Sequence, residues 1–387
     1  MVARGERRVS ECCSMTAISG QPAFPIPSAN IVRDLHRTMG DDADRSAMIQ
    51  AADEEGVTAL LWESLSSVEM GAEDAILRNE ITPSVRGAAT RELLVQIELR
   101  RILDRLAREH VRALVIKGTA LAYTVYGSAW HRPRTDTDLL IDPNETDEAI
   151  RVLESCGYAR SDAVTAGTLV THQAAFERVD DHGLSHVIDL HWRLVNPQVL
   201  ANVLPFEYLW QHAQPVAPLG PDARTPRAVD AVLVASIHRL AHHQGQDRLI
   251  WLYDLHLLTT RFTDVDWSVL ADAACRFGVA GLCLDGLRQA RARTGTRIPP
   301  RVEELWQATA PSERSHVYVS GPVLKRDVLA SDLAELPGWR ARARLVKEHA
   351  FPPAAFMRTR YGVTSAIWLP ALYVHRLITG TFKWLRH

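Results

Sequence analysis

Two aspartates separated by one residue, Asp136 and Asp138, begin a short apolar run, DTDLLI (136–141). In a β-strand, residues two positions apart point to the same face of the sheet, so the two carboxylates would lie side by side. Mg²⁺ is usually held by one or two carboxylates together with substrate phosphates. Two carboxylates this close repel each other when no cation is bound. The spacing therefore indicates a site for Mg²⁺, with Mn²⁺ as an alternative, although a lone D-x-D also occurs in solvated turns.

A phosphate-binding turn is predicted just upstream of this pair. The β-branched run ALVI (113–116) ends at Lys117 and Gly118, and a helix-forming segment follows from Thr119. Such a turn leaves backbone N–H groups without helical partners at the helix start, where the helix dipole also favours an anion. Gly118 allows close backbone approach to phosphate, Thr119 offers a hydroxyl, and Lys117 adds a positive charge. The alternative is an ordinary strand-to-helix turn.

A third carboxylate, Asp189, lies within the apolar run VIDLH (187–191). A carboxylate among apolar strand residues is costly if it is buried without a partner, so it is either paired or faces a site. His191 and Arg193 share its strand face by the same two-residue spacing. Asp189 is therefore a candidate general base or metal ligand, and a paired structural aspartate is the alternative.

These side chains need a scaffold, and the pattern of strands and helices predicts an α+β fold. We expect a small mixed β-sheet with helices on one face, flanked by N-terminal and C-terminal helical regions. The predicted divisions are a disordered leader (1–30), an N-terminal helical region (31–110), a core that carries the aspartates (111–215) and a C-terminal helical region (226–387). The predicted strands are 113–116 and 136–141 with a hairpin of 174–179 and 186–194, and the main predicted helices are 147–158, 228–243 and 248–261.

Together these motifs resemble the polymerase-beta-like nucleotidyltransferase superfamily. Its core has a strand, a glycine and a small hydroxyl residue opening a helix, D-x-D on the next strand and a third acid on a later strand. More narrowly, the chain is similar to uncharacterised bacterial nucleotidyltransferases with a K-G-x-A-L…Y…R-P-x-x-D-x-D-L-L block and an I-D-L-H-W-R block. The matching segments here are KGTALAYTVYGSAWHRPRTDTDLLI (117–141), IDLHWRL (188–194) and the His-rich HRLAHHQGQDRLIWLYDLHLL (238–258).

The resemblance covers roughly residues 90–260 and implies roles for single residues. Asp136 and Asp138 would be metal ligands, and Asp189 the third acid. Gly118 and Thr119 would hold the triphosphate. The spacer between this turn and the acids is longer than in most of the superfamily, but the narrow family shares it.

Two loop arginines precede the metal strand. Arg132 is the first candidate for bracing phosphate, because a guanidinium suits bidentate contact, and Arg134 is a lesser one. A surface loop charge is the alternative for either residue.

Three histidines on one predicted helix, His238, His242 and His243, invite a metal interpretation because the first two lie one turn apart. No carboxylate or cysteine stands at a matching spacing, so metal binding is disfavoured. A wall of the nucleotide pocket, shared with Trp251 and Asp254 of the next helix, is the functional hypothesis. Plain helix packing is the alternative.

The implied reaction moves an NMP from a nucleoside triphosphate to an unidentified hydroxyl acceptor, with release of pyrophosphate. Two alternatives stay open: a glycosyltransferase that uses D-x-D with a nucleotide-sugar, and a binding module that has lost turnover. The acceptor is expected to be a small molecule or a protein. A formal net charge of -2 disfavours a long nucleic acid.

The five cysteines match no zinc-site spacing, and the first residues lack an apolar secretory segment, so a reducing cytoplasm is expected. Residues 366–385 are long enough to cross a membrane, but charged residues and Pro370 interrupt them. We expect an amphipathic helix packed on the protein, with weak membrane-surface contact as the alternative.

Overall fold

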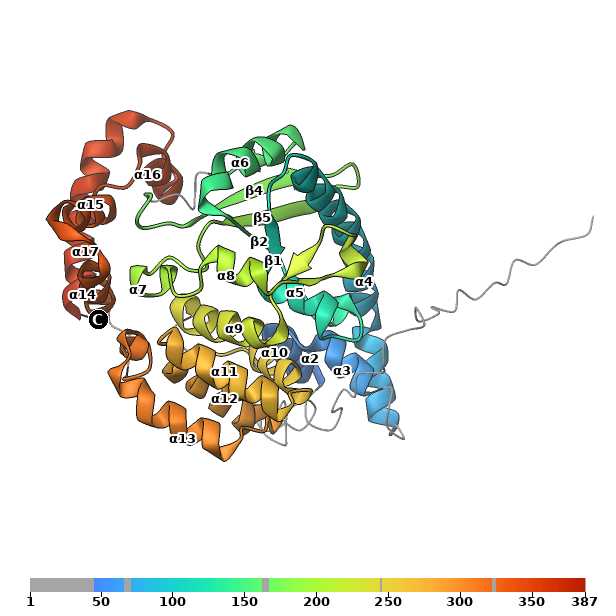
Figure 1. Ribbon diagram of the computed structural model, residues 1–387. Helices are drawn as coiled ribbons and strands as arrows, with labels where there is room; N and C mark the ends of the chain where they lie inside the picture. The colour runs from blue at the N-terminus through green and yellow to red at the C-terminus, as the bar shows by residue number, and fades with distance from the viewer. Residues whose placement is uncertain (1–44, 66–70, 162–166, 244–245, 322–324, 387) are drawn as a thin grey trace, which may run out of the picture.

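The computed structural model describes residues 45–65, 71–161, 167–243, 246–321 and 325–386, so the predicted leader (1–30) lies outside the described residues. The fold is α+β, as predicted, with one mixed sheet of seven strands in the order β3-β4-β5-β2-β1-β7-β6 (Figure 1). The strands are β1 (Ala113–Val115), β2 (Thr137–Ile141), β3 (Ala159–Arg160), β4 (Gln173–Val179), β5 (Ser185–His191), β6 (Gln214–Pro215) and β7 (Arg224–Thr225).

The predicted strands are confirmed, and β2 lies at the centre of the sheet. It pairs antiparallel with β1 and parallel with β5, and β4 and β5 form the predicted antiparallel hairpin. One edge extends past the predicted core, because β7 pairs parallel with β1 through Leu114 and Arg224. Two-residue strands such as β7 are too short to leave a periodic pattern in the sequence.

The sheet is covered on both faces, which differs from the expected one-sided arrangement. Leu139 and Ile141 of β2 pack with helices α4 (Ala72–Arg108) and α6 (Thr146–Ser155). Leu140 points the other way, into a core shared with α9 (Ala228–His243) and α10 (Leu249–Thr260). By the two-residue alternation of a strand, Asp138 shares the Leu140 face. Its carboxylate is thereby directed toward α9 and α10.

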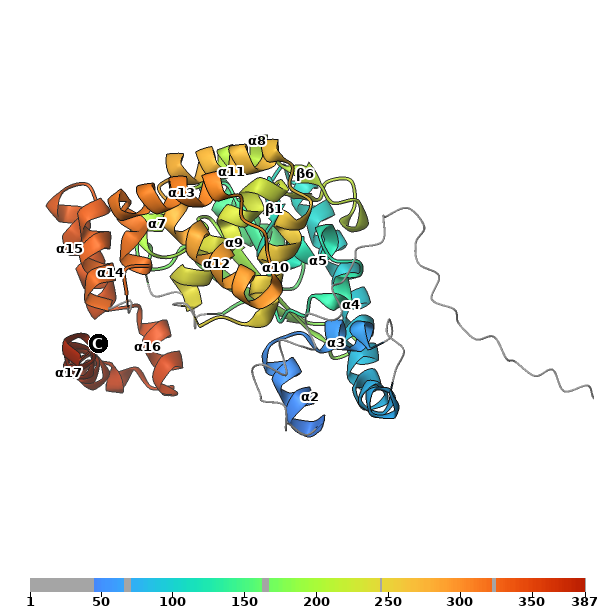
Figure 2. The ribbon, with the colours of Figure 1, turned by 90° about the horizontal axis from the view of Figure 1, so that it is seen from below.

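Helices precede and follow the sheet. Before it come α2 (Arg45–Glu54), α3 (Thr58–Ser64) and the long α4, and α5 (Lys117–Thr124) follows β1 directly. After β5 come α7 (Gln198–Ala201) and α8 (Phe206–Gln211), and after α10 come α11 (Asp264–Arg276), α12 (Ala280–Thr294), α13 (Pro300–Thr309), α14 (Lys325–Glu335), α15 (Gly338–Ala350), α16 (Ala354–Tyr361) and α17 (Leu369–Arg386). Figures 1 and 2 show α14–α17 on the opposite side of the molecule from α4.

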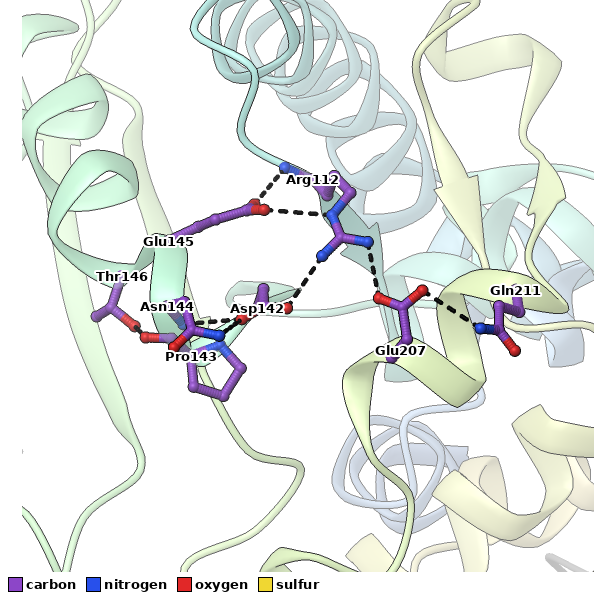
Figure 3. Close-up of polar contacts among 8 residues, drawn as sticks. All are labelled: Arg112, Asp142, Pro143, Asn144, Glu145, Thr146, Glu207 and Gln211. Carbon is purple, nitrogen blue, oxygen red and sulfur yellow. Dashed lines mark hydrogen bonds and ion pairs between the residues drawn. The ribbon is translucent and has the colours of Figure 1, made fainter.

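An arginine-centred ion cluster fixes the end of the sheet away from the aspartate pair (Figure 3). Arg112, immediately before β1, donates to Asp142 at 3.0 Å and Glu145 at 3.2 Å, both just after β2. Its remaining nitrogen reaches Glu207 of α8 at 2.8 Å. Because Ala113 and Ile141 are paired residues of β1 and β2, these contacts reinforce that register. The same register determines where Asp138 lies at the other end.

Candidate active site

Ten of the candidate site residues predicted from the sequence line one pocket of about 550 Å³. The pocket lies where the sheet meets three helices: the start of α5, the C-terminal half of α9 and the first half of α10. The ten are Lys117, Gly118, Thr119, Arg132, Asp136, Asp138, Asp189, His238, His242 and Asp254.

Two of the three acids lie directly opposite each other. Asp138 on β2 and Asp189 on β5 are paired residues of parallel strands. Asp136 immediately precedes β2 and shares the face of Asp138 by strand alternation. Three carboxylates from two neighbouring strands therefore meet at one edge of the sheet, although Asp136 and Asp189 are far apart in the sequence.

Asp138 already has a cationic partner within the chain. Lys117 Nζ donates to Asp138 Oδ1 at 2.8 Å, and both side chains are almost completely buried. His191 Nε2 lies 2.9 Å from the same oxygen and 3.2 Å from Lys117 Nζ. The backbone of Lys117 has φ 54°, a left-handed conformation that costs a non-glycine residue about 1–2 kcal/mol. Strain of this kind is typical of functional turns.

The three acids differ in their affinity for a proton. Burial alone would raise the pKa of Asp138, but the Lys117 ammonium and the His191 hydrogen bond hold it well below its usual range. Burial and the charge of Asp138 raise the pKa of Asp136. Burial and the charges of the other two aspartates raise the pKa of Asp189 to about 6. A pKa near 6 suits a general base that works close to neutral pH.

This donor set fits a divalent cation, because the raised pKa values of Asp136 and Asp189 arise partly from repulsion between carboxylates. Side-chain donor atoms of Asp138, Asp189 and His191 lie within 4.8 Å of one another, a spacing suited to one metal ion. His191 was not among the ligands predicted from the sequence, and Asp136 lies outside this tight group. The two-residue spacing from Asp189 was the available signal for His191.

The start of α5 forms the pocket wall next to the acids. Thr119 Oγ1 is buried, and among the described residues it has no hydrogen-bond partner, so it is available to a ligand. Gly118 is needed for a reason that the sequence did not reveal. A Cβ at this position would lie 3.1–3.3 Å from the guanidinium of Arg132, tighter than an ordinary contact.

Arg132 is committed to a buried ion pair with Asp254 of α10. Its Nε and Nη2 donate to the two carboxylate oxygens at 2.8–3.0 Å. Tyr126 adds a hydrogen bond from its hydroxyl to Asp254 at 2.7 Å. Arg132 and Asp254 both line the pocket, as predicted, but their charges neutralise each other. The pair ties the loop before β2 to the C-terminal helices.

Arg134 is paired in the opposite direction, toward α4. It donates to Glu92 at 2.7 and 2.9 Å, and Tyr123 also hydrogen-bonds to Glu92. The loop that delivers Asp136 and Asp138 is thus held between α4 on one side and α10 on the other.

The histidine helix forms a further wall. The rings of His238 and His242 are 4.8 Å apart and stacked, and the His243 ring lies 4.0 Å from that of Trp251. Burial, followed by the charge of Lys117, lowers the pKa of His242 to about 3 and also lowers that of His238. Both imidazoles are therefore neutral at physiological pH. Among described atoms, His242 Nε2 has no hydrogen-bond partner.

Sequence reasoning missed two further pocket residues. Gln173, on β4, lies 3.4 Å from Asp189 Oδ2 through its amide nitrogen. Arg248, at the start of α10, donates to the backbone carbonyls of Glu54 and Asp53 at 2.7 and 3.3 Å. Arg248 therefore contacts neutral carbonyl groups, whereas Arg132 is paired with the charged carboxylate of Asp254. Arg248 stands within the His-rich segment 238–258, but nothing in that segment singled it out, and Gln173 stands in no motif.

A family described as "Uncharacterised nucleotidyltransferase" matches residues 41–295, well over half of the chain. The matched range includes every residue that lines the pocket, from Asp53 to Asp254. No curated protein matches this chain.

Proposed function

Because the chain belongs to this family of uncharacterised nucleotidyltransferases, we propose that it transfers an NMP from a nucleoside triphosphate to a hydroxyl acceptor and releases pyrophosphate. The observation that carries the proposal is the meeting of three carboxylates with the start of a helix in one pocket. The acids would face the reacting phosphate while the helix start binds the phosphate chain. The glycosyltransferase alternative loses support because the family is one of nucleotidyltransferases.

Asp136, Asp138 and Asp189 would hold Mg²⁺, or Mn²⁺, and the bound cation would neutralise charge on the phosphates. The group of Asp138, Asp189 and His191 supports the same region as the cation site. His191 would orient the Asp138 carboxylate through the 2.9 Å contact with its Nε2.

The phosphate chain would lie against the start of α5. The first N–H groups of this helix have no helical partners and suit an anion. The unpartnered Thr119 hydroxyl would add a donor. Arg248, which lines the same pocket, would contact phosphate oxygens, and Lys117 would join it once the cation takes its place beside Asp138. Arg132 would act as a positioning residue, because Asp254 already neutralises it.

The chemical step would use Asp189 as general base. Its pKa is about 6 without a cation, and a bound cation would lower it, so Asp189 is deprotonated at neutral pH and able to accept a proton. The acceptor hydroxyl gives its proton to Asp189 while its oxygen bonds to the α-phosphorus. The bond between that phosphorus and the oxygen bridging to the β-phosphate breaks, and pyrophosphate leaves. The neutral walls formed by His238 and His242 would receive the nucleoside without adding charge.

The test is incubation of the full chain with each α-labelled NTP, Mg²⁺ or Mn²⁺ and a cell extract. We expect label on a discrete acceptor together with pyrophosphate release. Asp138→Asn and Asp189→Asn should each lower turnover more than about a hundredfold. Asp272→Asn, an exposed aspartate on α11, is the matched control and should keep full activity.

Each alternative has its own outcome. Release of a nucleoside diphosphate from a nucleotide-sugar, without pyrophosphate from any NTP, would favour a glycosyltransferase. Metal-dependent NTP binding with no labelled product would favour a binding module. Full activity of Asp138→Asn would contradict the assignment of the acids.

A further inference from the structure

The C-terminal segment, residues 338–387, has an unusual charge. It contains nine lysines and arginines and a single acidic residue, Glu348, while the whole chain has a net charge of -2. Exposed members of this basic set are Arg340, Arg342, Arg344, Lys347, Arg358 and Arg360. Glu348 is already engaged, because it pairs with Arg344 at 2.9 Å and accepts the Leu169 backbone N–H at 2.7 Å.

The same segment exposes apolar side chains. Of the fourteen large apolar side chains that are exposed among the described residues, eight lie between residues 339 and 378. They are Trp339, Val346, Phe351, Ile367, Trp368, Val374, Leu377 and Ile378. Ile367 is 79% exposed, Trp339 74% and Trp368 58%. Single exposed apolar residues need no explanation, but eight of them within residues 339–378 indicate an interaction surface.

Helix α17 turns an apolar stripe toward solvent, although Leu369 and Leu372 on its other side are half-buried. Its polar residues Tyr373 and Arg376 point inward, where they donate to the carbonyl oxygens of Pro352 and His349. Its apolar residues Val374, Leu377 and Ile378 point outward. These three stand at positions i, i+3 and i+4 and so form one stripe. A helix that served only the core would turn this stripe toward the protein.

We propose that the surface of α15–α17 and the Ile367–Trp368 turn docks this protein onto an anionic membrane. Exposed tryptophan and aliphatic residues would enter the boundary between headgroups and acyl chains, and the surrounding arginines would attract anionic lipids. No helix among the described residues is long and apolar enough to cross a membrane, which agrees with binding at the surface. Figures 1 and 2 show these helices at one side of the molecule.

A membrane fits this surface better than a nucleic acid or a second copy of the chain. Nucleic acids engage basic residues and aromatic rings, but they offer little to aliphatic side chains such as Val374, Leu377 and Ile378. A second copy would bring a net charge of +8 against an equal charge, because the segment has nine basic residues and one acidic one. An anionic bilayer matches both the charge and the hydrocarbon requirement.

The experiment is co-sedimentation of the full chain with vesicles of phosphatidylcholine alone or with about 30% phosphatidylserine. We expect binding to the anionic vesicles only, weakened between about 0.1 M and 0.5 M salt by screening. Ile367→Ser combined with Trp368→Ser should lower the vesicle-bound fraction at least about tenfold. The matched control is Leu93→Ser combined with Ile97→Ser, two exposed apolar residues of α4.

A second variant addresses charge and does not touch the apolar stripe. Arg358→Gln combined with Arg360→Gln should lower anionic-vesicle binding about tenfold, whereas Arg297→Gln combined with Arg301→Gln should not. Circular dichroism melting establishes that each variant is folded. Failure of the wild-type chain to bind anionic vesicles overturns the proposal. Vesicle binding that neither variant changes also overturns it. The same holds if the chain binds single-stranded RNA but not vesicles, or if it does not bind vesicles and forms a dimer that the Ile367→Ser, Trp368→Ser variant dissociates.

Discussion

Replacement of Arg132 by methionine distinguishes a guanidinium that serves the fold from one that serves the nucleotide. In the structure, Arg132 makes three contacts of 2.8–3.0 Å with Asp254, and both side chains are more than 90% buried. Methionine has a similar length but no charge, so among the described residues Asp254 would keep only the Tyr126 hydroxyl as a hydrogen-bond partner. Loss of one member of a buried ion pair costs about 3–5 kcal/mol.

This cost is a large fraction of the total stability of an ordinary domain, about 5–15 kcal/mol. With a urea dependence of about 3 kcal/mol per M, the unfolding midpoint of Arg132→Met should fall by about 1 M or more. The assay is equilibrium unfolding in urea, followed by circular dichroism. Arg108→Met is the matched control, because Arg108 pairs with Asp104 at the surface, with exposures of 68% and 51%. That variant should change stability by less than about 1 kcal/mol.

The double variant, Arg132→Met with Asp254→Leu, provides a further check. Removing both charges eliminates the uncompensated carboxylate, so the double variant should be more stable than Arg132→Met alone. It should remain below the wild type because the Tyr126 hydroxyl loses its acceptor. An Arg132→Met protein with the wild-type midpoint and only a higher KM for NTP would refute this reasoning. Arg132 would then act on the nucleotide.

Three other outcomes follow from the pocket. In EDTA, Asp189→Asn should raise the urea midpoint near pH 7. The pKa of Asp189 is about 6 in the folded protein and about 3.9 in the unfolded chain. Wild-type stability therefore falls as the pH rises from about 4 to about 6, and the asparagine variant escapes this loss. This gain should shrink near pH 4, and a gain independent of pH contradicts it. Lys117→Gly should be about 1 kcal/mol more stable than Lys117→Ala, since both lack the ammonium but only glycine tolerates φ 54° without strain; equal urea midpoints refute the strain. Arg248→Gln should raise the KM for NTP about tenfold in steady-state assays with little change in stability, and an unchanged KM removes Arg248 from the phosphate site.

Much of the candidate site was predictable because its signals are local. The alternation in DTDLLI is enough to put Asp136 and Asp138 on one strand face, and the sheet confirms strand β2 over residues 137–141. The hairpin that contains Asp189 and the helix 228–243 also carry their own periodicity, whereas the helix 249–260 is marked by an apolar run, LIWLYDLHLL. These patterns depend on side chains a few residues apart, so the sequence alone contains them.

Other features depend on residues distant in the chain, and no local pattern encodes them. The pairing of Asp138 with Asp189 requires β2 and β5 to be neighbours, which the strand order decides. The bond between Lys117 and Asp138 and the burial of Arg132 against Asp254 arise only when α5 and α10 pack on the sheet.

The chain's residue types and spacings thus determined which groups are able to do chemistry. Tertiary structure decided which of them neutralise one another. The physical reason is that the charge state of a group depends on its burial and on the few atoms within hydrogen-bonding distance. Asp136 and Asp138 illustrate the difference: they have the same side chain, yet the pKa is raised for one and lowered for the other because only Asp138 contacts Lys117 and His191.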